Sequence, residues 1–173
     1  RINNKPFLLF IMKQLDRCNI KNFVLLTGYK GEKIKDYFKN GEKYGWKITY
    51  SHGPEDWNTG KRVFNAKKFF FKNFYLLYSD NFINFNIKKL ENKHLSSQDP
   101  ITLLLVKKNN GNISLDKKLC IKTYDPKRIK KNLNFVELGY MAIDKKKLFL
   151  NFDEIIEKNF NFSKILEVFS KKK

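Results

Sequence analysis

The sequence predicts an α/β domain in which a mostly parallel sheet is covered by helices. Short hydrophobic runs alternate with helical patterns along the first part of the chain, which is typical of parallel strands joined by helices. The length of 173 residues and the hydrophobic content of 42% suit one domain with a sizeable core. Aromatic residues make up 16% of the chain, far more than a disordered chain contains.

The predicted elements follow one another in a regular order. Apolar residues at three- and four-residue spacing predict helices, whereas short apolar runs predict buried strands. Pro6 suits the first turn of a helix, and Asn58 with Thr59 can cap another. The expected helices are 6–18, 30–38, 60–69 and 87–95, and the expected strands are 22–26, 46–50, 74–78 and 101–106. This order favours a parallel sheet.

The pattern changes after residue 109. Asn109-Asn110-Gly111-Asn112 is a strong hairpin-turn signal. Strands are expected at 113–115, 119–124 and 135–143 without full helices between them, followed by helices at 145–150 and 162–169. Because no internal repeat or low-complexity linker interrupts the chain, residues 1–173 are expected to form a single domain.

The chain is strongly basic, with 36 Lys+Arg against 17 Asp+Glu and a net charge of +19. Such a charge suggests nucleic acid or an anionic membrane as a partner. Only four of the basic residues are Arg, however, and Arg is the residue that binds phosphates and bases bidentately. Lys, Asn, Ile and Phe are abundant together, as an AT-rich genome produces. We favour codon bias and solvated helix faces, with a polyanion-binding surface as the alternative.

Cysteine usage and hydropathy indicate the compartment. The longest apolar run, 6–12, is about a third of the ~20 residues that span a bilayer. No signal or transit sequence is recognisable. Cys18 and Cys120 cannot form a disulfide framework. We therefore expect a protein of the reducing cytoplasm that has no membrane partner.

Asp80 is the sharpest candidate for chemistry. In an open α/β sheet, ligands bind beyond the carboxyl ends of the strands. Polar, turn-prone residues stand at three such ends, at 27–29, 51–55 and 79–81. A carboxylate directly after a buried strand can hold Mg²⁺ against a phosphate. The alternative is that Asp80 only starts the following turn or helix.

Two further segments are candidates for ligand contact. Thr59 and Gly60 open a helix whose free amides favour an anion or a base edge, although an ordinary helix cap looks the same. Glu137 and Gly139 share one face of an apolar strand, where an isolated Gly often marks close backbone approach. A surface Glu on an edge strand is the alternative there. Lys127 can reach a sugar phosphate, but in a chain this basic such a lysine is often incidental.

Other familiar sites are excluded by the residues. His52 and His94 lack the cysteines or carboxylates that a zinc site needs. None of the eight glycines forms a G-x-G pair, so a dinucleotide fingerprint and a P-loop are excluded within this sequence.

Five segments, in chain order, resemble the sugar-phosphate nucleotidylyltransferase family (the NTP transferase domain). Residues 4–8 (NKPFL) resemble the helix start gKPfle, and 21–34 its second strand, turn and helix. Residues 55–60 (EDWNTG) stand in place of EplGTgGal. Residues 75–82 (YLLYSDNF) are similar to the metal strand lllygDnf, and 136–140 (VELGY) to the sugar-binding strand naGiy. The resemblance covers nearly the whole chain.

The resemblance implies a three-layer α/β/α Rossmann-like sandwich of the nucleotide-diphospho-sugar transferase type. It implies a Mg²⁺-dependent reaction in which a sugar 1-phosphate displaces pyrophosphate from an NTP to give an NDP-sugar. The implied partners are these two substrates and no specific nucleic acid, and a homo-oligomer is left open. The implied contacts are Mg²⁺ for Asp80, the base or ribose for Thr59 and Gly60, the sugar for Glu137 and Gly139, and the sugar phosphate for Lys127.

The chain also departs from the family pattern. No Gly-rich loop with its basic residue precedes Arg1, and no second metal-binding Asp follows before Lys173. We therefore expect an internal fragment that is inactive alone and has a gap in its sheet. Residues 57–62 (WNTGKR) replace lGTgGa, which suggests a divergent subgroup. That subgroup is most similar to enzymes acting on heptose or mannose 1-phosphates, with guanine or cytosine nucleotides, in surface-glycan synthesis.

Two other functions stay open at this point. A basic nucleic-acid-binding module would show steeply salt-dependent binding. A non-catalytic nucleotide-sugar-binding homologue would bind ligand without releasing pyrophosphate.

Overall fold

A computed structural model describes residues 2–150 and 159–171 of the chain. Within these residues no helix is both long enough and apolar enough to cross a membrane. The helices are α1 (Phe7–Asp16), α2 (Gly31–Phe38), α3 (Thr59–Asn65), α4 (Ile87–Ser97), α5 (Lys145–Leu150) and α6 (Phe162–Lys171), with 3₁₀ turns η1 (Glu42–Tyr44) and η2 (Lys67–Phe69). The strands are β1 (Asn22–Thr27), β2 (Lys47–His52), β3 (Asn73–Leu77), β4 (Ile101–Lys107), β5 (Ile113–Leu115), β6 (Ile121–Tyr124) and β7 (Phe135–Asp144).

Every predicted helix and strand is present, with boundaries shifted by a few residues. The largest difference is in the predicted helix 60–69, which ends as α3 at Asn65 and continues as the separate turn η2. Asn58 occupies the N-cap position of α3 as predicted, but its side chain makes no capping hydrogen bond. Periodicity and turn residues therefore located the elements correctly, but the capping hydrogen bond expected from Asn58 is not made.

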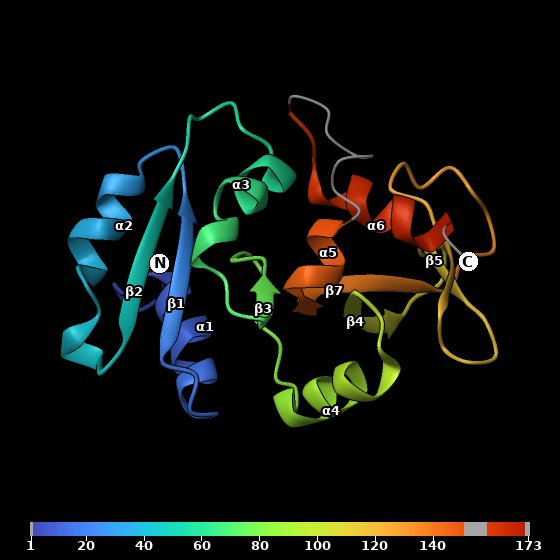
Figure 1. Ribbon diagram of the computed structural model, residues 1–173, viewed down its shortest axis with the longest axis horizontal. Coiled ribbons are helices and arrows are strands. Elements are labelled where there is room, and N and C mark those ends of the chain that lie inside the picture. The colour runs from blue at the N-terminus through green and yellow to red at the C-terminus, as the bar shows by residue number, and fades with distance from the viewer. Residues whose placement is uncertain (1, 151–158, 172–173) are drawn as a thin grey trace.

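The strands that the structure describes form two sheets, with no pairing between them (Figure 1). β1 and β2 make a parallel pair in which Phe23 lies opposite Ile48. The second sheet has the order β3-β7-β5-β6, with β4 also paired to β7. Every pair in this second sheet is antiparallel. The expectation of a mostly parallel sheet is therefore not met in the described part of the chain.

Strand β7 explains this difference. β3 and β4 are connected through α4, and both are antiparallel to β7, so they run parallel to each other as the alternation predicts. β7 inserts between them, and its Ala142 lies opposite both Tyr75 of β3 and Thr102 of β4. No local signal reveals this insertion, because β7 lies far along the chain from both strands.

The turn at residues 109–112 does not make the expected hairpin. β4 and β5, the strands on either side of it, both pair with β7. Ile113 of β5 lies opposite Phe135, the residue that also lies opposite Lys107 of β4. β4 and β5 thus pair with β7 and not with each other.

Two hydrophobic cores lie on opposite faces of β3. Phe74, Leu76 and Tyr78 pack into a core formed with α3, α5, α6 and β7. Tyr75 and Leu77 pack into a core formed with α1, α2, β1 and β2. This division follows from the alternation of side chains along a strand. Helices therefore cover both faces of β3, which is the wall shared by the two cores.

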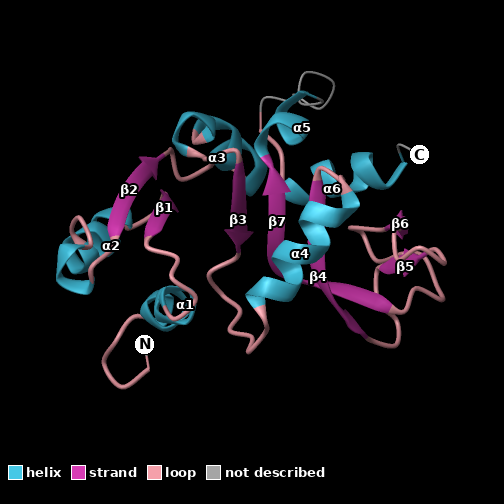
Figure 2. Cartoon of the chain, turned by 60° about the horizontal axis from the view of Figure 1, so that its bottom comes forward, coloured by secondary structure: helices cyan, strands magenta, loops and turns pink. Residues whose placement is uncertain are grey.

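The interruption expected in the sheet is present. Among the strands that the structure describes, β1 pairs with β2 and β3 pairs with β7, and β1 does not pair with β3. Figure 2 shows β1 and β3 as neighbouring strands of the two sheets. Each of them has one edge whose backbone groups are not used in a ladder.

Leu148 and Leu150 on α5 test the first core. Leu148 is fully buried in this core, whereas the Leu150 side chain is 68% exposed. We expect Leu148→Ala to lower the free energy of unfolding by about 2–5 kcal/mol, because it leaves a cavity. We expect Leu150→Ala to change it by no more than about 0.5 kcal/mol. Urea unfolding followed by circular dichroism measures both, and equal losses would contradict this placement of α5.

His94 makes stability depend on pH. Its side chain is buried against β4, with Nδ1 3.0 Å from Oγ1 of Thr102. Burial lowers the pKa of His94 and outweighs the attraction of Asp144. The unfolded chain therefore binds this proton more readily than the folded one, and we expect the free energy of unfolding to fall as the pH drops below about 6.5.

The measurement is the urea midpoint between pH 7.5 and pH 5. The drop should be smaller in His94→Gln, which has no titrating ring. An equal drop in both proteins would show that other groups cause it. His52, which is exposed, is retained in both.

Candidate functional site

The turn after β3 presents Asp80 to solvent. Tyr78 donates its backbone N–H to the carbonyl oxygen of Gly139 at 2.9 Å, so the start of the turn is held by β7. Nδ2 of Asn81 lies 3.4 Å from the carbonyl oxygen of Leu138. Helix α4 begins several residues later, so Asp80 does not start that helix. The Asp80 turn therefore lies against the segment that carries Gly139.

A second contact ties the same turn to β7. The hydroxyl of Tyr140 donates to the carbonyl oxygen of Asn81 at 2.8 Å, and its ring packs edge-on against Phe85 with centroids 4.9 Å apart. Tyr140 is almost fully buried, so this bond is shielded from water. The structure therefore brings together two segments, Asp80 and Glu137–Gly139, that the sequence placed far apart.

Glu137 is half-buried on a central strand. It lies opposite Leu105 of β4, so the interpretation of a surface Glu on an edge strand does not hold. Oε1 of Glu137 accepts a hydrogen bond from the hydroxyl of buried Tyr124 at 3.3 Å. This bond provides one partner for a carboxylate that would be costly to bury alone.

The two tyrosines near Glu137 report on the charge of the site. Burial raises the pKa of Tyr78 to about 12, and the negative charges of Glu137 and Asp80 add to the effect. Burial also raises the pKa of Tyr124, again with Glu137 as the next cause. Both phenols therefore stay protonated at neutral pH, and the Tyr124 hydroxyl keeps the hydrogen that it donates to Glu137.

Position 139 requires a glycine for two reasons, its backbone conformation and the closeness of Tyr78. Its φ is +72°, in the left-handed region that side chains disfavour. A Cβ there would lie 2.7 Å from Cδ2 of Tyr78. The space beside Gly139 is therefore filled by Tyr78 on that side.

Lys127 lies in a loop built on the carboxylate of Asp125. That buried carboxylate accepts the backbone N–H groups of Lys127, Ile129 and Lys130 at 3.2, 2.8 and 2.7 Å. These hydrogen bonds lower the pKa of Asp125, and the bond from the Lys130 amide contributes most. Lys127 itself is exposed, three residues beyond the Tyr124 that contacts Glu137.

Thr59 and Gly60 are partly covered by the chain itself. The Thr59 Oγ1 accepts the backbone N–H of Phe162 at 2.9 Å. The N–H of Gly60 donates to the carbonyl oxygen of Phe160 at 3.0 Å, and the Phe160 ring lies against the position a Gly60 Cβ would take. Gly60 is buried, whereas Thr59 is exposed. The Gly60 amide, expected to be free for a ligand, is therefore bonded to Phe160 instead.

Sequence reasoning missed the role of Arg62. Its guanidinium lies among the backbone carbonyls at the ends of β1 and β2, including the Thr27 oxygen 2.7 Å from Nη1. The Gly53 N–H donates to the same Thr27 oxygen at 3.0 Å. The one available signal was an Arg two residues beyond Gly60 in a chain that otherwise uses Lys.

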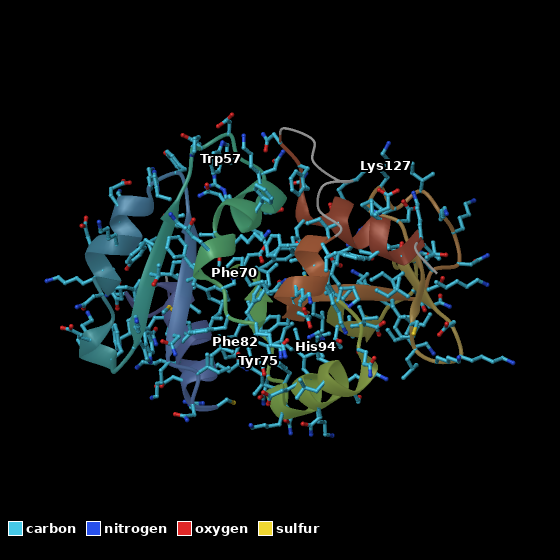
Figure 3. The ribbon with its side chains drawn as sticks, viewed as in Figure 1. Trp57, Phe70, Tyr75, Phe82, His94 and Lys127 are labelled. Atoms are coloured by element: carbon cyan, nitrogen blue, oxygen red, sulfur yellow. The ribbon has the colours of Figure 1, made fainter. Side chains whose placement is uncertain are left out.

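The predicted residues fall into two groups. Asp80, Glu137 and Gly139 form one, and Thr59 with Gly60 the other. Figure 3 shows Trp57, two residues before Thr59, well separated from Phe82, two residues after Asp80, while Lys127 lies apart from both. The segments that follow β1 and β2 meet, since Gly53 bonds to Thr27. The turn after β3 does not join them, as the separation of Phe82 from Trp57 in Figure 3 shows.

The residues present fit a magnesium ion that is held by a single protein carboxylate together with substrate phosphates. Asp80 offers an exposed carboxylate, the type of oxygen ligand that Mg²⁺ prefers. The described residues contain no cluster of three or more His, Cys, Asp or Glu that would form a complete metal cage. Mg²⁺ is commonly held by one or two carboxylates together with substrate phosphates, and Asp80 fits that arrangement.

Comparison with known proteins identifies relatives in sequence. A family model described as nucleotidyl transferase matches residues 1–114, more than half of the chain. The D-glycero-alpha-D-manno-heptose 1-phosphate guanylyltransferase of Campylobacter jejuni is 31% identical over 170 residues, 96% of this chain and 73% of that protein. A probable glucose-1-phosphate cytidylyltransferase of Bacillus subtilis is 33% identical over 114 residues, 54% of this chain and 45% of that protein.

Solved structures share the fold. HddC from Yersinia pseudotuberculosis complexed with GMP-PN matches with a TM-score of 0.75 at 20% identity, over 94% of this chain and 72% of that one. A putative glucose-1-phosphate thymidylyltransferase from Bacillus anthracis, in complex with a sucrose, matches with a TM-score of 0.79 at 16% identity, over 99% and 73%. At these identities the likeness is one of fold.

Gly139 and Gly45 form a matched pair for testing the site. Both have positive φ, but nothing lies within 4 Å of a Cβ at Gly45. We expect Gly45→Ala to cost about 1–2 kcal/mol of unfolding free energy from backbone strain alone. Gly139→Ala should cost more, because Tyr78 must also move. Chemical denaturation measures both, and equal costs would mean that Tyr78 does not constrain position 139.

Proposed function

The chain belongs to the nucleotidyl transferase family, and on that premise we propose that it couples a sugar 1-phosphate to an NTP. The products are an NDP-sugar and pyrophosphate. The observation that carries the proposal is the contact between the Asp80 turn and the Glu137–Gly139 strand. It puts a carboxylate suited to a metal beside a segment suited to a sugar. On the nucleotide side, the proposed residues are Thr59 and Gly60 at the start of α3.

The reaction is one displacement at phosphorus. A phosphate oxygen of the sugar 1-phosphate forms a bond to the α-phosphorus of the NTP, and the bond from that phosphorus to the pyrophosphate oxygen breaks. Mg²⁺, when bound, offsets the negative charge on the phosphates. Asp80 would hold this ion through its exposed carboxylate.

The remaining residues bind and orient the substrates. Glu137 accepts hydrogen bonds from sugar hydroxyls with Oε2, the carboxylate oxygen that Tyr124 does not contact. Gly139 lets Tyr78 pack closely beside the strand that faces the sugar. Lys127 lies apart from this group (Figure 3), so its contact with the sugar phosphate is proposed from the family resemblance alone. Thr59, which is exposed beside Gly60, meets the ribose or base at the start of α3. Holding both substrates in one geometry lowers the entropic part of the barrier.

The substrate we favour is a heptose 1-phosphate, with guanine as the base. Support comes from the Campylobacter jejuni heptose 1-phosphate guanylyltransferase, whose similarity extends over 96% of this chain. A cytosine nucleotide is the next choice of base, since a probable glucose-1-phosphate cytidylyltransferase is similar over 54% of the chain. A mannose 1-phosphate is the next choice of sugar, from the family resemblance alone. The product would serve polysaccharide synthesis on the cytoplasmic side.

Pyrophosphate release tests the proposal. The product of the full reading frame that contains this sequence is incubated with Mg²⁺, each NTP and a set of sugar 1-phosphates. Release that needs both substrates supports the proposal, and the preferred pair identifies sugar and base. Binding of nucleotide without release would instead favour a non-catalytic homologue, and salt-sensitive binding of RNA or DNA alone would favour a nucleic-acid-binding protein.

Asp80→Asn tests the metal carboxylate. This change keeps the shape of the side chain but removes its charge, so we expect kcat to fall by about 100-fold or more. Asp36→Asn is the control, because Asp36 is an exposed residue on α2 and the change is chemically identical. Unchanged turnover in Asp80→Asn, or an equal loss in both variants, would remove Asp80 from the mechanism.

A further inference from the structure

We propose that Arg62 is a positioning residue that fixes the loop 53–58 in the shape that receives the nucleotide. It acts through the backbone of this loop and does not touch the substrate. The inference rests on the proposed function for its ligand, but its geometry is independent of that function. Arg62 lies on α3, at the point where the carboxyl ends of β1 and β2 meet the loop.

The guanidinium makes a complete set of hydrogen bonds to carbonyl oxygens. An arginine has five N–H donors in a rigid planar fork. The structure gives five acceptors, all of them backbone oxygens and four of them on the loop itself. They are Trp57 at 3.0 Å from Nε, Thr27 and Gly53 at 2.7 and 3.4 Å from Nη1, and Pro54 and Glu55 at 2.7 and 3.3 Å from Nη2. The positive charge of the Arg62 guanidinium therefore stabilises one backbone conformation of the loop 53–58.

Because all five N–H donors of Arg62 are used, its role is to hold the loop and not to bind the substrate. With every N–H directed to a carbonyl oxygen, no donor is left to bind a phosphate. Among the described residues, no carboxylate forms an ion pair with Arg62, so the carbonyl dipoles balance its charge. A lysine at this position has three donors at one point and cannot span the same acceptors.

The surroundings are shaped for the guanidinium. A Cβ at Gly28 would clash with the guanidinium group, so only glycine leaves room for it at the end of β1. On the other side of the loop, Asn159 accepts the N–H of Asn58 and donates to the carbonyl oxygen of Asp56, each at 2.8 Å. The loop is therefore held from both sides, and the exposed Thr59 follows directly from it.

Arg62→Lys is the principal test, with Arg17→Lys as the matched control. Arg17 is an exposed residue at the C-cap of α1, so the same change there should be neutral. Hydrogen exchange of the amides in 53–58 measures the loop directly. We expect exchange to speed up by about tenfold or more in Arg62→Lys, because bonds to a charged donor are lost, and to stay unchanged in Arg17→Lys.

Kinetics of the full-reading-frame protein supply the functional readout. In Arg62→Lys we expect KM for the NTP to rise by about tenfold while KM for the sugar 1-phosphate is unchanged. In Arg62→Ala, millimolar guanidinium should restore part of the affinity for NTP by filling the vacated site. Circular dichroism confirms that both variants fold, and Arg62→Lys alone carries the test if the alanine variant does not.

The outcomes separate this inference from the proposed function. Exchange and NTP affinity in Arg62→Lys equal to those in Arg17→Lys would overturn the role of Arg62. Equal increases of both KM values would also overturn it, because they indicate a general structural defect. Failure of the wild-type protein to release pyrophosphate would overturn the proposed function. Hydrogen exchange of the loop 53–58 and direct NTP binding would still test the role of Arg62 in that case.

Discussion

The two sheets of this structure are held together by side chains packed on both faces of β3. Within residues 2–150 and 159–171 the two sheets share no hydrogen-bonded pair, so the backbone ladder does not join them. Instead Leu76 and Leu77, neighbours in sequence, point into different cores. Hydrophobic packing carries no direction along the strand, whereas a ladder fixes register. The relation between the β1–β2 sheet and the rest of the molecule therefore depends on how well α1 and β1 fill the space beside Tyr75.

Most of the elements could be predicted from the sequence, but their pairing could not. Periodicity and turn residues act over a few residues, and they located helices such as α4 and α6 closely. The place of β7 depends on contacts between distant segments, such as Ala142 with Tyr75 and Thr102. Local patterns carry no information on these contacts. The same reason explains why the turn at 109–112 joins two strands that do not pair with each other.

The candidate site shows the same division. Asp80 and Gly139 were noticed because a carboxylate after a strand and a glycine within one are visible in the sequence, and the structure places their segments in contact. Arg62 was not noticed, because its partners are backbone carbonyls, and a carbonyl looks the same at every residue. Phe160 was missed for a similar reason, since an aromatic residue before a helix is ordinary until it lies against Gly60.

The edges of β1 and β3 that pair with no described strand, and the net positive charge, act in opposite directions on association between copies of this chain. An unpaired strand edge is a template on which another copy of the chain can add a strand, the first step of aggregation. A net charge of +19 makes two copies repel each other before their edges meet. Salt screens that repulsion within about 10 Å at 0.1 M, so rising ionic strength removes the protection. The colloidal behaviour of this chain thus links its lysines to the interruption in its sheet.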